Sequence, residues 1–258
     1  MHIEKQVLRN LPKYGKMYLG ELILSGKLAL KGQVHQYPEV KALRNFLHKF
    51  EVDCVFDVGA NHGQYASTLR HDVGYKGLIL SFEPAPGVFE SLERQSRRDG
   101  KWHTFQLALS DHAGTAPFHI TALDRASSLN APVADMPSDF TEFCEVTETV
   151  DVDVRKLDDM IGELQAQYGF KRPYLKLDTQ GHDLLVAEGA KKCISGMLGI
   201  QTELAIRPIY EQAPHYRTMI DWLEEQDFLP SAFFANNRGH FPLVYEMDGI
   251  FVNRKLLK

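Results

Sequence analysis

The sequence is poor in cysteine and in long apolar runs, and each absence excludes a class of protein. Its three cysteines, Cys54, Cys144 and Cys193, are an odd number at wide spacing, which fits neither a disulfide framework nor a zinc-binding cluster. No stretch reaches the roughly 18 uninterrupted apolar residues of a membrane-spanning helix, and no apolar segment of the signal-peptide type follows the start. We therefore expect a cytoplasmic protein with free thiols and no resident metal.

An excess of positive charge is also missing, because the formal net charge is −5. This balance argues against a nucleic-acid partner held by bulk electrostatics. The exception is the segment 1–31, in which six lysines and arginines stand against two glutamates and alternate with apolar residues. Two interpretations stay open for this arm: weak contact with a membrane or another anionic surface, or, as is commoner, a helical face in solvent.

With 44% apolar and 24% charged residues, the chain can bury a core of ordinary size. We divide it into an N-terminal helical extension, 1–50, and a main domain, 51–258. Pro38 and the apolar residues after it predict a helix that leads to the first strand. The segment 123–141 has no clear period, and a long irregular loop in a compact domain is usually a lid or a binding loop.

From residue 54 on, patterns typical of strands alternate with patterns typical of helices. Strands are expected at 54–57, 78–82, 104–109, 118–121, 150–154, 174–177, 199–204, 228–234 and 249–252, and helices at 64–70, 87–98, 157–168, 184–190 and 219–226. This alternation predicts an α/β fold with a doubly wound, mostly parallel sheet. We expect 150–154 to be an exposed edge strand, and the last two strands to form a hairpin edge around a turn at 236–239, with one antiparallel member.

The most informative stretch lies at the end of the first predicted strand. Asp57 is followed by Gly59, Asn61 and Gly63, residue types that accept a left-handed backbone. A sharp turn there can leave room for a ligand at the N-terminus of the next helix. The second predicted strand ends in Glu83 and Pro84, and an acidic residue at that position typically accepts hydrogen bonds from a ribose.

The same residues favour one nucleoside over another. A dinucleotide loop has the pattern Gly-x-Gly-x-x-Gly, but the middle glycine is absent here and Asp57 stands two residues before the first. A carboxylate at that point repels pyrophosphate and attracts a cation. S-adenosylmethionine carries a sulfonium and an ammonium without a phosphate, so it is the expected cofactor, and an NAD-dependent oxidoreductase is the alternative.

Ligands of such sheets gather beyond the carboxyl ends of the strands, where Asp178 and Glu203 are expected. Either carboxylate is a candidate general base for an acceptor hydroxyl. His182 is a third candidate, although a lone histidine more often lies on the surface or in a satisfied core. A structural pair of Lys176 with Asp178 remains an open alternative to a catalytic role.

Several ordered motifs between about residues 52 and 252 resemble the FkbM family of methyltransferases. They are Asp-Val-Gly-Ala-Asn-x-Gly at 57–63, Phe-Glu-Pro at 82–84, Ala-Leu-Ser-Asp at 108–111, Leu-Asp-Asp at 157–159, Leu-Lys-Leu-Asp-Thr-Gln-Gly-His-Asp at 175–183 and Glu-Gly-Ala at 188–190. The resemblance implies a Rossmann-like seven-stranded sheet with an antiparallel last strand. It also implies direct methyl transfer to a hydroxyl of a sugar, lipid or secondary metabolite.

The resemblance also implies roles for particular residues. The loop glycines and Asn61 would face the methionine and ribose parts of the cofactor, Glu83 the ribose hydroxyls, and Ala108, Leu109 and Ser110 the adenine. Asp178 would lie near the transferred methyl group. A cofactor-binding partner protein without turnover is the non-enzymatic alternative, and neither the acceptor nor the oligomeric state follows from the sequence.

Overall fold

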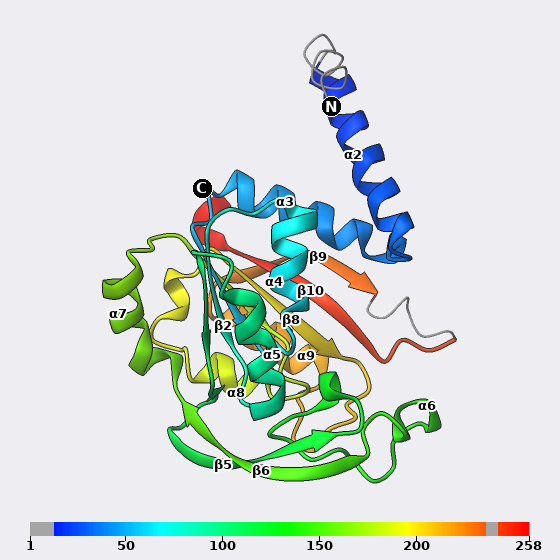
Figure 1. Cartoon of the computed structure of the whole chain (residues 1–258), viewed down its shortest axis with the longest axis vertical. Helices are drawn as coiled ribbons and strands as arrows, with labels where there is room; N and C mark the ends of the chain where they lie inside the picture. The colour runs from blue at the N-terminus through cyan, green and yellow to red at the C-terminus, as the bar shows by residue number, and fades with distance from the viewer. Residues whose placement is uncertain (1–12, 236–241, 258) are drawn as a thin grey trace.

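The computed structural model describes residues 13–235 and 242–257, and a seven-stranded sheet forms its centre (Figure 1). The strand order is β3-β2-β1-β7-β8-β10-β9. The strands are β1 (Cys54–Val58), β2 (Leu78–Phe82), β3 (Trp102–Phe105), β7 (Pro173–Leu177), β8 (Gly199–Ala205), β9 (Phe228–Ala235) and β10 (Glu246–Asn253). The chain order therefore reverses direction at β1, next to β7, and this is the place where ligands bind in open α/β sheets.

The predicted direction of the strands is confirmed. β1 pairs in parallel with β2 and β7, and β7 pairs in parallel with β8, whereas β10 runs antiparallel to both β8 and β9. β10 lies between β8 and β9, so β9, the earlier of the last two strands, forms the edge of the sheet. The predicted turn at 236–239 lies outside the described residues.

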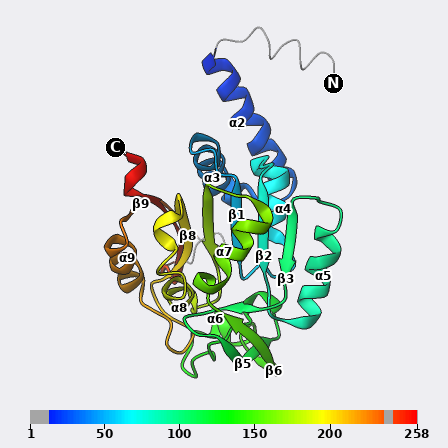
Figure 2. The ribbon, with the colours of Figure 1, turned by 90° about the vertical axis from the view of Figure 1, so that its left-hand side faces the viewer.

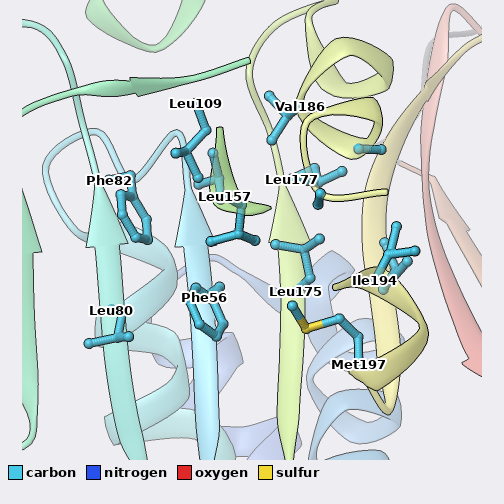
Figure 3. Close-up of a cluster of buried hydrophobic side chains, with 14 of the residues drawn as sticks. Phe56, Leu80, Phe82, Leu109, Leu157, Leu175, Leu177, Val186, Ile194 and Met197 are labelled. Carbon is cyan, nitrogen blue, oxygen red and sulfur yellow. The ribbon is translucent and has the colours of Figure 1, made fainter. Parts of the chain in front are cut away.

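Helices cover both faces of the sheet, because alternate residues of each buried strand point to opposite sides. On one face, Phe56, Leu80 and Leu175 pack with Leu157 and Val186 (Figure 3). The helices of this face are α7 (Leu157–Tyr168), α8 (Asp183–Glu188) and α9 (Tyr216–Glu225), and the opposite face carries α3 (Tyr37–Lys49), α4 (Gln64–Thr68) and α5 (Pro86–Ser96). All of these helices were predicted to within a few residues, and a π-helical turn, η2 (Leu69–Val73), continues α4.

A second sheet, of order β4-β6-β5, corrects two of the predictions. Its strands are β4 (Ala108–Leu109), β5 (Gly114–Thr121) and β6 (Val146–Arg155). The strand expected at 104–109 is wrong as one element, because β3 ends at Phe105 and residues 108–109 pair with β6. The edge strand expected at 150–154 is also wrong, since β6 lies between two partners.

The N-terminal helices differ in how they meet this body. α3 buries Val40, Leu43, Phe46 and Leu47, and they join the core that includes strand residues of the main sheet. α2 (Lys13–Leu30) instead extends away from the body, as Figures 1 and 2 show. A 3-10 turn, η1 (Val34–Gln36), lies between the two helices. Among the described residues, no helix has the length and apolar character needed to cross a membrane.

Candidate active site

The loop after β1 has the left-handed backbone that its residue types predict. The φ angles are +73° at Gly59, +46° at Asn61 and +87° at Gly63. A Cβ on Gly59 would lie 1.9 Å from the carbonyl oxygen of Asp178, and a Cβ on Gly63 would lie 2.7 Å from the Trp102 ring. Close packing against other parts of the protein is therefore a second physical reason for both glycines, beside the left-handed backbone.

Glu83, at the end of β2, is held by the backbone of two loops. Its Oε2 accepts a hydrogen bond from the Asn61 N–H at 2.8 Å, and its Oε1 accepts one from the Ala85 N–H at 2.9 Å. The residue is 5% exposed, and this burial raises the pKa of the carboxyl from its ordinary 4.5 to about 7. Each oxygen keeps a further acceptor position for a ligand hydroxyl.

Asp57 is fully buried below the loop and forms an ion pair with Lys176. The Lys176 Nζ lies 3.2 Å from Asp57 Oδ1 and 3.4 Å from Asp178 Oδ2. The Ser81 hydroxyl donates to the second Asp57 oxygen at 3.0 Å. Burial alone would lower the pKa of Lys176, but the carboxylates of Asp178 and Asp57 outweigh that effect and raise it. The negative charge of Asp57 is therefore balanced by Lys176 within the protein.

Asp178, just beyond β7, remains accessible, and 44% of its side chain is exposed. Its Oδ1 accepts a hydrogen bond from the Gln180 amide at 2.9 Å, and the same amide lies 3.5 Å from Glu203 Oε2. Burial, followed by repulsion from Glu246, raises the pKa of Glu203 well above its ordinary value. Asp178 is thus the more exposed of the two predicted bases, and Gln180 links them.

His182 lies in a buried hydrogen-bond chain. Its Nδ1 is 2.7 Å from Asn130 Oδ1, and its Nε2 is 2.9 Å from the Ser110 hydroxyl. Since burial lowers the pKa of the imidazole to about 4, the neutral ring donates from Nδ1 and accepts at Nε2. Both ring nitrogens are therefore engaged within the protein, and this arrangement favours a structural role for His182 over that of a general base.

A first pocket, of about 510 Å³ with its open mouth included, brings together many of the predicted site residues. Those that line it are Gly59, Asn61, Glu83, Pro84, Ala108, Leu109, Asp178 and His182. Asp57, Gly63, Ser110 and Glu203 are not among its lining residues. The pocket thus extends from the β1–β2 edge of the main sheet to β4 of the second sheet.

A second pocket adjoins the first at the β1 loop. It shares Gly59, Asn61, Arg125 and Asp178 with the first. The rest of its lining is mostly amide, hydroxyl and charged groups, from Lys31, Gln33, Gln36, Ala60, Gln64, Tyr65, Ser67, Thr68, Asp72 and Lys176. The exposed carboxylate of Asp178 therefore lies where the two pockets meet.

Sequence reasoning missed several residues of the first pocket. Phe118 and Leu129 form part of its apolar wall, and Asp124 and Arg125 belong to the short helix η3 (Asp124–Ala126) in the loop expected to be irregular. The length of that loop was the available signal, and the expectation of a binding loop at 123–141 agrees with this placement. Gln180 could have been suspected because it lies between two candidate bases, but its positive φ of +53° appears only in the structure.

The family model described as "Methyltransferase FkbM domain" matches residues 57–230. A protein named "Methyltransferase 1" from Beauveria bassiana is 25% identical over 182 residues, which cover 60% of this chain and 71% of that protein.

Two solved structures are among those similar to this chain. Cofactor-bound Rv0187 from MTB is 12% identical, with a TM-score of 0.48 over 84% of this chain and 80% of that one. Magnesium protoporphyrin IX methyltransferase from Synechocystis is 10% identical, with a TM-score of 0.44 over 86% of this chain and 81% of that one.

Proposed function

Since this chain belongs to the FkbM family of methyltransferases, we propose that it transfers a methyl group from S-adenosylmethionine to a hydroxyl oxygen of a sugar, lipid or other metabolite. The observation that carries the proposal is the position of Asp178 at the junction of the two pockets. One pocket suits the cofactor and the other suits the acceptor, so the junction is where an acceptor oxygen would meet the methyl group.

The first pocket has the chemistry that this cofactor requires. The carboxylate of Glu83 can accept hydrogen bonds from a ribose diol, and Leu107, Leu109 and Leu129 offer apolar contact to an adenine ring. Asp178 supplies negative charge for the sulfonium.

The cofactor supplies a methyl group on a sulfonium, and the reaction forms a carbon–oxygen bond to the acceptor while the carbon–sulfur bond breaks. The protein's main contribution is to hold the two reactants in line, which can supply about 7 to 11 kcal/mol in well-oriented systems. We assign Asp178 the removal of the acceptor's hydroxyl proton, a step that contributes about 10² to 10⁴ in rate. The amide of Gln180 and the ammonium of Lys176 hold the carboxylate in place.

The lining of the second pocket supports a polar acceptor. Amides and hydroxyls dominate that lining, and among them are Gln33, Gln36 and Ser67. Such groups lose hydrogen bonds to water when a purely apolar molecule covers them. A polyhydroxylated acceptor replaces those bonds, so the pocket favours a sugar over a lipid chain.

The test is methyl transfer from labelled S-adenosylmethionine to pools of glycosides and of hydroxylated lipids. We expect a product that gains one methyl group and resists mild alkali, as an ether does and an ester does not. Asp178→Asn should lower kcat by about 10² or more and leave the affinity for S-adenosylhomocysteine within about twofold. Asp151→Asn, on the exposed part of β6, is the matched control.

Two results would contradict the proposal. One is methyl transfer only to amines or carboxylates, and the other is an Asp178→Asn variant with unchanged turnover. Calorimetry with S-adenosylhomocysteine and with NAD tests the oxidoreductase alternative, because a site without a pyrophosphate-binding glycine loop should bind only the first. Binding without turnover on either pool would favour the inactive partner protein.

A further inference from the structure

Helix α2 has one apolar side that the rest of the protein covers. Leu24 and Leu28 are 4% and 0% exposed and pack with α3 and the sheet. Ion pairs hold the same side of the helix to the body, with Lys31 at 2.8 Å and Lys27 at 3.0 Å from the buried carboxylate of Asp72. The helix is therefore fixed to the protein along one side of its C-terminal half.

The opposite side of α2 is also apolar, and it is open. Leu22 is 68% exposed, Ile23 57% and Leu30 93%. Positions 22, 23, 26 and 30 repeat every three or four residues and so share one side of a helix. Gly26 lies between them, and no atom stands within 4 Å of where its Cβ would be. A helix that is apolar on two sides is normally covered on both.

The charge of the N-terminal segment indicates which kind of surface covers the open side of α2. Residues 1–31 carry six basic and two acidic side chains. Lys27 and Lys31 pair with Asp72 on the covered side, so the other four basic and two acidic side chains leave a net charge of +2. A surface that combines negative charge with accessible hydrocarbon suits such a segment. A second protein is a poorer match, because three aliphatic side chains fall far short of the roughly 20 to 30 residues per side in a stable interface.

We propose that α2 docks on an anionic lipid surface. The helix lies in the interfacial layer with Leu22, Ile23 and Leu30 among the lipid chains, while Leu24 and Leu28 stay packed on the protein. This mode needs no membrane-spanning segment, and the described residues contain no helix that could provide one. It is independent of the identity of the methyl acceptor.

The experiment is co-sedimentation of the full chain with vesicles of phosphatidylcholine alone and of phosphatidylcholine with about one-third phosphatidylglycerol. We expect binding to the anionic vesicles that weakens as salt is raised, because exposed charges are screened. The double variant Leu22→Gln/Ile23→Gln should lower the partition coefficient at least tenfold. Leu257→Gln is the matched control, since that leucine is also 56% exposed but lies in the C-terminal turn η5 (Arg254–Leu257).

Two further measurements keep the result decisive. Thermal unfolding and S-adenosylhomocysteine binding should be unchanged in the double variant, which shows that its fold is intact. The proposal is overturned if the wild type ignores anionic vesicles, or if the folded double variant binds them as the wild type does. It is also overturned if light scattering shows a dimer that the double variant loses while vesicle binding persists.

Discussion

Glu83 offers the sharpest test of the cofactor site, because its carboxyl group is buried and its pKa is raised from 4.5 to about 7. A cofactor hydroxyl donates a stronger hydrogen bond to the ionised carboxylate than to the neutral acid. About one-tenth of Glu83 is ionised at pH 6 and about nine-tenths at pH 8. If only the ionised form binds well, the apparent Kd for S-adenosylhomocysteine falls about tenfold between these two pH values.

The raised pKa of the Glu83 carboxyl also makes the stability of the protein depend on pH. Since its folded pKa lies above its unfolded one, the folded protein holds more protons between pH 4.5 and 7. The free energy of unfolding contributed by Glu83 is therefore fully present below pH 4.5 and is lost as pH rises through 7. A difference of 2.5 pKa values corresponds to about 3 kcal/mol.

The assay compares wild type with Glu83→Gln, by calorimetry with S-adenosylhomocysteine at pH 6, 7 and 8, and by urea unfolding at pH 5 and 8 without ligand. In the variant, both pH dependences should flatten, because an amide does not titrate in this range. Its affinity at pH 8 should also fall by about 10 to 150-fold, as for loss of a hydrogen bond to a charged group. A wild-type Kd that changes less than twofold between pH 6 and 8, or an equal change in the variant, would refute the reasoning.

Two other substitutions test the packing below the site. Gly59→Ala should lower the free energy of unfolding in urea by more than Gly74→Ala does. Both glycines have a positive φ, but only a Cβ on Gly59 would meet another atom, the Asp178 carbonyl oxygen at 1.9 Å. Equal losses in the two variants would contradict the packing argument. Lys176→Met should cost about 3 to 5 kcal/mol, because it leaves the Asp57 carboxylate buried without its cation. Adding Asp57→Asn should recover part of that loss, and a double variant no more stable than Lys176→Met would contradict the ion-pair explanation.

The fold could be predicted where local pattern and burial agree. The strands β1, β2 and β7 are short runs in which four of the five residues are apolar, and the helices between the strands have a clear period of three to four residues. The second sheet could not be predicted, because β4 consists of two residues and its partner β6 is separated from it by more than 35 positions. Such pairing depends on long-range contacts that no local pattern records.

The sequence by itself determined the type of site, which consists of a left-handed loop after β1, an acidic residue at the end of β2 and a second acidic residue after β7. These three features could be predicted because each needs only a particular residue type at the end of a strand. Tertiary structure decided how each of them is used. It buries Asp57 against Lys176, engages both nitrogens of His182, and leaves Asp178 exposed between two pockets. The physical reason is that the charge and reactivity of a side chain depend on its solvent exposure and on partners far away in the chain, which only the folded molecule brings together.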